Sequence, residues 1–156
     1  MHWTAGAWKA NSTDVQYYHI LVEDDGKLVR GVYSIKDNVN CGDGRYAAHT
    51  KNCNTGSIGV SVCCMAGAVQ NPFSAGKFPM TDEQRHTLTA VVSELCHSYS
   101  IPVTSGTTLT HAEVQKTLGI AQSGKIDIMW LPGMSKMGDA IVLGDQLRSE
   151  IQSRLD

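Results

Sequence analysis

Residues 19–33 read His19-Ile20-Leu21-Val22-Glu23-Asp24-Asp25-Gly26-Lys27-Leu28-Val29-Arg30-Gly31-Val32-Tyr33. The run from His19 to Glu23 has the composition of a short β-strand. Asp24-Asp25-Gly26 is a strong turn signal, and the chain from Lys27 to Tyr33 returns as the partner strand. The stretch therefore predicts an antiparallel hairpin. Further strands and helices are predicted from the rest of the sequence.

Two further strands are expected. Ser57 to Cys64 reads as a buried strand, because β-branched Ile58, Val60 and Val62 share one face. Ile101 to Ser105 is expected to be another. The segments 38–54 and 67–79 show little periodicity and are expected to be loops.

Three helices follow from local signals. Thr81-Asp82-Glu83-Gln84 is a capping box, and the helix behind it should run to about Tyr99. Its buried stripe is formed by residues at helical spacing: Leu88, Val91, Val92 and Leu95. A second helix is expected over 110–118, stopped by Gly119. A third is expected over about 137–155, weakened by Gly144. Strands interleaved with helices predict an α/β fold with one mixed central sheet flanked by helices.

Size and composition limit the class of protein. A chain of 156 residues is expected to form a single domain, here 1–156, without a separate binding domain. Hydrophobic residues make up 42% and charged residues 18%, so the chain is neither disordered nor a membrane protein. The net charge of −2 gives no basic surface for nucleic acid. We therefore expect no nucleic-acid partner and no membrane, and the sequence leaves the oligomeric state open.

Three residues far apart in the sequence could form a metal site. His2, His111 and Asp127 offer two imidazoles and one carboxylate. That set suits a catalytic Zn²⁺ whose fourth position stays open for water. Any chain with six histidines offers many such triples. The alternative is that His2 is a disordered terminal residue and that His111 is an ordinary histidine at a helix start.

The surrounding sequence makes this set more specific. Four groups of residues occur in order: His2-Trp3-Thr4-Ala5, then Tyr17-Tyr18-His19-Ile20-Leu21-Val22 with Asp25-Gly26-Lys27-Leu28, then Ala48-His49-Thr50 with Asn54-Thr55-Gly56-Ser57-Ile58-Gly59-Val60-Ser61, and finally the segments around His111 and Asp127. Together they resemble the zinc-dependent N-acetylmuramoyl-L-alanine amidases, the family shared by phage endolysins, bacterial cell-wall amidases and peptidoglycan recognition proteins. The resemblance covers roughly residues 1–132. It implies that His2, His111 and Asp127 are the zinc ligands.

The resemblance also implies an activity. The enzyme would hydrolyse the amide between the lactyl group of N-acetylmuramic acid and L-alanine of peptidoglycan. We expect a phage or prophage endolysin that consists of a catalytic domain only. One alternative is a cytoplasmic amidase that recycles soluble muropeptides. Another is a non-catalytic peptidoglycan-binding module, although such modules typically lack a zinc ligand.

Four other residues receive roles from the resemblance. Tyr18 matches the position of a catalytic tyrosine whose phenol could hydrogen-bond the transition state. Lys125 would stabilise the developing oxyanion if residues 125–127 are extended, because both side chains would then share a face. His49 and Asn54 would contact substrate. Without the resemblance, a tyrosine such as Tyr18 is more often a packing residue, and the alternative for Lys125 is a lysine that faces solvent.

Two features depart from the family's pattern. The family has a β-strand before the first ligand, whereas this sequence starts one residue before His2. We therefore expect the metal, and not a strand, to hold His2. The interval from His111 to Asp127 is also longer than is usual in the family, and an apparent helical insert occupies it.

The cysteines and the N-terminus bear on other possibilities. The five cysteines lack CxxC spacing and are odd in number, which argues against a disulfide framework; they are Cys41, Cys53, Cys63, Cys64 and Cys96. A cysteine hydrolase with His49 or His97 as base is conceivable. No signal peptide is recognisable. We expect synthesis in the cytoplasm and, for an endolysin, action on the cell wall after release by another agent.

Overall fold

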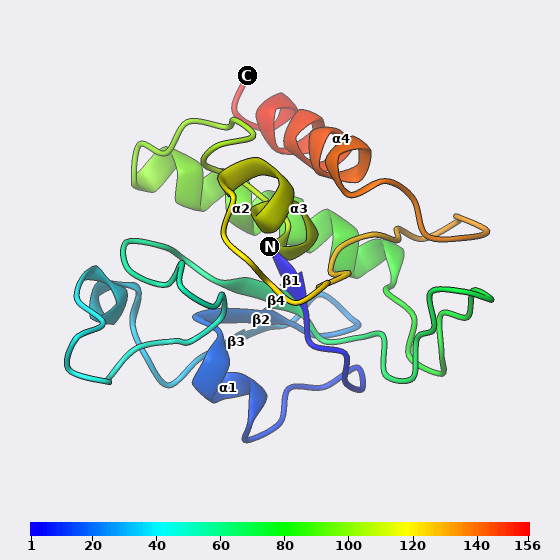
Figure 1. The fold of residues 1–156 in the computed structure, drawn as a ribbon, viewed down its shortest axis with the longest axis horizontal. Helices are drawn as coiled ribbons and strands as arrows, with labels where there is room; N and C mark the ends of the chain where they lie inside the picture. The colour runs from blue at the N-terminus through cyan, green and yellow to red at the C-terminus, as the bar shows by residue number, and fades with distance from the viewer.

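A four-stranded sheet forms the centre of the computed structural model, which describes residues 1–156 (Figure 1). The strands are β1 (His2–Trp3), β2 (Ile20–Val22), β3 (Leu28–Arg30) and β4 (Val60–Val62), and they lie in the order β1-β4-β2-β3. β4 pairs in parallel with both β1 and β2, whereas β2 and β3 are antiparallel. The sheet is therefore mixed, and the predicted α/β class is confirmed.

The predicted hairpin is present with shorter strands than expected. Gly26 donates its backbone N–H to the Glu23 carbonyl (2.9 Å) and closes the turn between β2 and β3. β3 ends at Arg30, because Val32 donates instead to the Val15 carbonyl (2.7 Å). Val15 belongs to α1 (Asp14–Tyr17), a short helix that the sequence analysis did not predict. The hairpin and α1 together enclose the segment that carries Tyr18.

The expectation that no strand holds His2 is wrong. His2 lies in β1, in register with Ser61 of β4, and Thr4 extends the pairing by donating to the Val62 carbonyl (2.9 Å). On the other side, His111 donates its backbone N–H to the Met1 carbonyl (3.0 Å). Backbone hydrogen bonds on both sides therefore fix His2 without help from a metal.

Three helices cover one side of the sheet, with α1 on the other (Figure 1). They are α2 (Asp82–Ser98), α3 (His111–Leu118) and α4 (Ala140–Ser153), and α2 packs between the sheet and α4. The predicted capping box at Thr81 is confirmed. The Gln84 N–H donates to the Thr81 hydroxyl (3.1 Å), and the Gln84 side-chain oxygen accepts the Thr81 N–H (3.0 Å). Gly119, at φ 71°, ends α3 as predicted.

Two local expectations need correction. Residues 101–105 form no strand, because Pro102 has no N–H to donate and Ile101 donates to the Cys96 carbonyl at the end of α2 (2.9 Å). Thr104 bonds locally with Thr107. A short 3-10 helix, η1 (Ile35–Val39), was not expected; a capping box at Ser34 begins it, and its last two residues overlap the loop expected over 38–54.

One hydrophobic core joins the sheet to the helices. It includes Val22, Val60 and Val62 from the strands, and from the helices Leu88, Val92, Cys96, Leu143, Leu147 and Ile151. The predicted α2 stripe is confirmed, since Leu88 and Val92 are buried and Val91 and Leu95 pack against the same cluster. None of the helices combines the length and apolarity needed to cross a membrane.

Candidate active site

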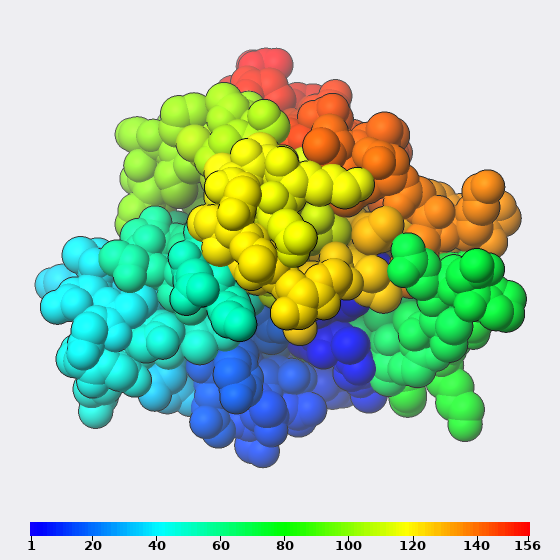
Figure 2. All heavy atoms as spheres, in the orientation of Figure 1, coloured from blue at the N-terminus to red at the C-terminus, as the bar shows by residue number.

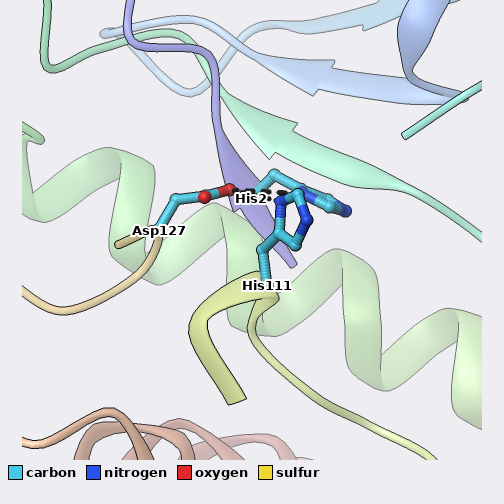
Figure 3. Close-up of side chains that lie close together, drawn as sticks. All are labelled: His2, His111 and Asp127. Atoms are coloured by element: carbon cyan, nitrogen blue, oxygen red, sulfur yellow. Dashed lines mark hydrogen bonds and ion pairs between the residues drawn. The ribbon is translucent and has the colours of Figure 1, made fainter. Parts of the chain in front are cut away.

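His2, His111 and Asp127 converge from three different parts of the fold (Figure 3). His2 comes from β1, His111 is the first residue of α3, and Asp127 lies in the irregular segment that follows α3. All three side chains are buried. Residues separated by up to 125 positions in the sequence thus form one cluster.

The three donor atoms form a nearly equilateral triangle. His2 Nδ1 lies 3.1 Å from His111 Nδ1 and 3.2 Å from Asp127 Oδ2, and His111 Nδ1 lies 3.3 Å from the same oxygen. Bonds of about 2.0–2.1 Å to a tetrahedral zinc ion would separate two ligand atoms by about 3.3 Å. The residues present therefore fit zinc in both donor type and spacing.

Backbone contacts around the start of α3 position two of the three side chains. Thr110 caps the helix, and the Glu113 carboxylate accepts hydrogen bonds from the Thr110 N–H (2.8 Å) and hydroxyl (3.1 Å). Ala112 donates its N–H to the Asp127 carbonyl (2.6 Å). The long interval between His111 and Asp127 therefore closes back onto the first turn of α3.

The charges of the cluster suit a cation. Burial lowers the pKa of His2 to about 4, so its imidazole is neutral at pH 7. Burial opposes ionisation of Asp127, but its close contacts with the imidazoles of His111 and His2 outweigh burial and lower the pKa of this carboxyl to about 2. Metal ligands must be deprotonated, so these two groups are in the form that binds a metal.

Two residues that the sequence analysis missed contact the outer nitrogens of the histidines. Gln122 Oε1 lies 2.8 Å from His111 Nε2, and the Gln122 side-chain amide donates to the Lys51 carbonyl (2.7 Å). The Thr50 hydroxyl lies 3.5 Å from His2 Nε2. Thr50 belongs to one of the quoted motifs but received no role, and no motif marks Gln122; the contacts join positions 11 to 71 apart in sequence, so spacing did not reveal them.

A cleft of about 930 Å³ opens beside the cluster. Its lining includes His111, Asp127 and all four residues expected to act on substrate: Tyr18, Lys125, His49 and Asn54. In Figure 2 the N-terminal segment (dark blue) lies below the segment after α3 (yellow), between two surface loops (cyan and green). A second groove of about 830 Å³, with a more apolar lining, contains His2 together with His49 and His111, but it contains neither Asp127 nor any of Tyr18, Lys125 and Asn54. The first cleft is therefore the candidate for the reaction.

Tyr18 lies against the cluster. Its ring centroid is 5.3 Å from that of His2, and it is extended between α1 and β2. Burial raises its pKa, so the phenol keeps its proton at pH 7. The neighbouring Tyr17 ends α1 and lines the same cleft.

Lys125 lies at the exposed rim of the same cleft. It forms no ion pair with any residue of the chain. Gly124 (φ 70°) precedes it, and a turn begins at Asp127. The Lys125 ammonium group is therefore free to contact a substrate.

His49 and Asn54 organise the loop between η1 and β4. Asn54 Oδ1 accepts the Thr50 N–H (2.8 Å), and His49 Nδ1 lies 2.8 Å from the Thr50 hydroxyl. His49 Nε2 is buried without a hydrogen-bond partner. Burial, and next the proximity of the His2 imidazole, lowers the pKa of His49 to about 2. His49 is thus a buried neutral imidazole with one unpaired nitrogen, whereas the Asn54 side chain is partly engaged by its own loop.

The cysteine alternative receives no support. All five cysteines are free, and none forms a hydrogen bond to a histidine. Burial raises the pKa of Cys63 to about 12 and that of Cys64 well above its ordinary value. Because the thiolate is the nucleophile, both are inert.

Comparison with protein families tests the family resemblance that the sequence motifs indicated. A family model described as N-acetylmuramoyl-L-alanine amidase matches residues 1–128, which is most of the chain and includes His2, His111 and Asp127. The chain belongs to this amidase family. Membership makes it a hydrolase of the class that acts on peptidoglycan. The match ends before α4, and no curated protein sequence matches the chain.

Proposed function

We propose that this amidase is zinc-dependent and hydrolyses the amide between the lactyl group of N-acetylmuramic acid and L-alanine. The triangle of two imidazole nitrogens and one carboxylate oxygen is the observation that supports zinc most directly. Three protein ligands leave a fourth position open, as a catalytic site requires. A candidate for every ligand is present, which favours an enzyme over a non-catalytic binding module.

Each residue of the cleft has a separate task in this proposal. Zinc held by His2, His111 and Asp127 would activate water and polarise the scissile carbonyl. The Tyr18 phenol donates a hydrogen bond to the oxygen that becomes negative, and the Lys125 ammonium neutralises the same charge from the rim. His49 and Asn54 hold the glycan–peptide substrate from the loop between η1 and β4.

We further propose that the protein is a phage or prophage endolysin. It would be made in the cytoplasm and would act on the cell wall after release. Family membership supports a peptidoglycan substrate, and a cleft open to solvent suits a polymer. A muropeptide-recycling amidase would share the same ligands and prefer soluble fragments.

The proposal predicts about one zinc per chain in the purified protein. Digestion of sacculi should release stem peptides with a new L-alanine amino terminus, a chelator should stop the reaction, and added zinc should restore it. The measurements are elemental analysis and labelling of free amino termini. Activity on soluble muropeptides but not on sacculi would favour the recycling enzyme. Absence of zinc, with no hydrolysis after zinc is added, would reject the metalloenzyme.

A second prediction concerns the anchoring of His2. Because strand pairing holds this residue, the N–H groups of Thr4 and His111 should keep their hydrogen-exchange protection after chelation. The exchange of both amides can be followed by NMR with and without zinc. If chelation removes protection from these amides but not from the β2–β4 pairs, the metal orders β1 instead.

A further inference from the structure

Gln122 is buried and hydrogen-bonded although it lies in an irregular segment of the chain. It lies in the irregular segment between α3 and Asp127, yet only 3% of it is exposed. Its backbone N–H donates to Gln115 Oε1 (2.8 Å), its side-chain nitrogen donates to the Lys51 carbonyl (2.7 Å), and its side-chain oxygen faces His111 Nε2 (2.8 Å). One backbone bond and two side-chain bonds therefore fix this residue.

These contacts determine where His111 carries its proton. A backbone carbonyl only accepts, so the NH₂ group of Gln122 must face Lys51 and its oxygen must face His111. That oxygen also only accepts, so His111 Nε2 must carry a hydrogen. In a neutral imidazole the other nitrogen, Nδ1, is then left with a lone pair, and it points toward His2 and Asp127.

Without Gln122 a competing arrangement is available. Asp127 Oδ2 lies 3.3 Å from His111 Nδ1, and a buried carboxylate favours a hydrogen on the nitrogen that faces it. A proton on Nδ1 would occupy the lone pair that a metal needs. Gln122 works against this tautomer because it provides an acceptor on the opposite side of the ring.

We propose that Gln122 is a positioning residue that holds His111 in the Nε2–H tautomer and aims its Nδ1 lone pair at the metal site. Through the Lys51 carbonyl, it also ties the loop that carries His49 and Asn54 to a metal ligand. The part of this inference that concerns metal affinity rests on the proposed zinc dependence. The part that concerns the tautomer holds for the metal-free protein.

Two variants test the proposal. Gln122→Met keeps the length of the side chain and removes the acceptor, so zinc should bind about 10–100-fold more weakly, as for other outer partners of ligand histidines. Gln122→Glu keeps an acceptor for His111 and should retain the Nε2–H tautomer. Zinc affinity is measured by competition with a chromophoric chelator, and the tautomer of His111 by ¹⁵N NMR of the metal-free protein.

Gln84→Met is the matched control. Gln84 is also a fully buried glutamine that donates to backbone carbonyls, those of Val22 and Cys63, but it does not contact the cluster. Its loss should lower stability and leave zinc affinity unchanged. Equal zinc affinity in Gln122→Met and Gln84→Met would overturn the proposal. So would an Nδ1–H tautomer of His111 in the wild-type protein.

The NMR measurement separates this inference from the proposed function. If the wild-type protein binds no zinc, zinc dependence fails, while the tautomer of His111 still decides the role of Gln122: Nε2–H in the wild type with Nδ1–H in Gln122→Met supports it, and Nε2–H in both of these proteins overturns it. If Gln122→Met does not fold, the wild type and Gln122→Glu decide it. An Nε2–H tautomer in both supports the proposal.

Discussion

Tyr18→Phe and Lys125→Ala are each expected to lower turnover by about 10²–10³ while the protein keeps its zinc. Each change removes one group proposed to stabilise the negative oxygen of the transition state, and loss of one such donor typically has this effect. Neither residue belongs to the ligand triangle. Because the lost interaction forms mainly in the transition state, KM should change much less than kcat.

His111→Ala should behave differently, because two remaining protein ligands hold zinc poorly. It should lose the metal and hydrolysis together. Tyr33→Phe and Lys77→Ala are matched controls, because neither Tyr33 nor Lys77 lines the cleft and Lys77 is exposed as Lys125 is. Turnover and zinc content are measured for all five proteins. Near wild-type kcat in Lys125→Ala would reduce that lysine to a surface residue.

The residues of the cluster could be predicted from the sequence, whereas the strand and the side chains that hold them in place could not. His111 and Asp127 were recognisable because their motifs keep the family's order, and α3 was recognisable from Thr110 and Gly119. A two-residue strand such as β1 has no periodicity to detect, so the support of His2 was not predictable. Gln122 and Thr50 act through contacts with residues distant in the sequence, and only the folded chain brings these partners together.

The same distinction holds for the elements. The turn at Gly26 and the capping box at Thr81 depend on residues within a few positions, and both were predicted correctly. Residues 101–105 have the composition of a strand, but Pro102 and the hydrogen bonds at the end of α2 decide their conformation. Local composition could not anticipate these bonds.

Gly144 shows how a residue that weakens a helix can be required by packing. It lies inside α4, where glycine is less favourable than alanine by about 1 kcal/mol. A Cβ at this position would lie 2.1 Å from the Glu113 carboxylate, which its bonds to Thr110 hold in place. The glycine therefore lets α4 approach the start of α3, directly behind His111.

Arg148 of α4 completes this contact. Its guanidinium binds both carboxylate oxygens of Glu113 (2.8 and 3.1 Å), and it also donates to the Thr108 carbonyl (2.9 Å) and to Asp145 (2.6 Å). Glu113 is fully buried and Arg148 is 6% exposed. The residues that the family model matches end before α4, so this part of the support for His111 comes from outside them.

Arg148→Met is accordingly expected to lower the free energy of unfolding by about 3–5 kcal/mol, because it leaves the buried Glu113 carboxylate without the arginine that pairs with its charge, and only the hydrogen bonds from Thr110 remain. The double variant Glu113→Gln/Arg148→Met should recover much of this loss. It removes both charges, and a glutamine can still accept the Thr110 N–H as in other capping boxes. Urea denaturation of the metal-free protein measures all three stabilities without a contribution from bound zinc.

Arg85→Met is the control that shows how much of the stability loss in Arg148→Met comes from the burial of its ion pair. Arg85 pairs with Glu150, so it also joins α4 to a neighbouring helix, but both side chains are partly exposed and neither touches α3. Loss of such a pair should cost at most about 1 kcal/mol. If Arg148→Met cost no more than Arg85→Met, the carboxylate of Glu113 would have to be satisfied by other groups, and α4 would not be needed to hold the helix that presents His111.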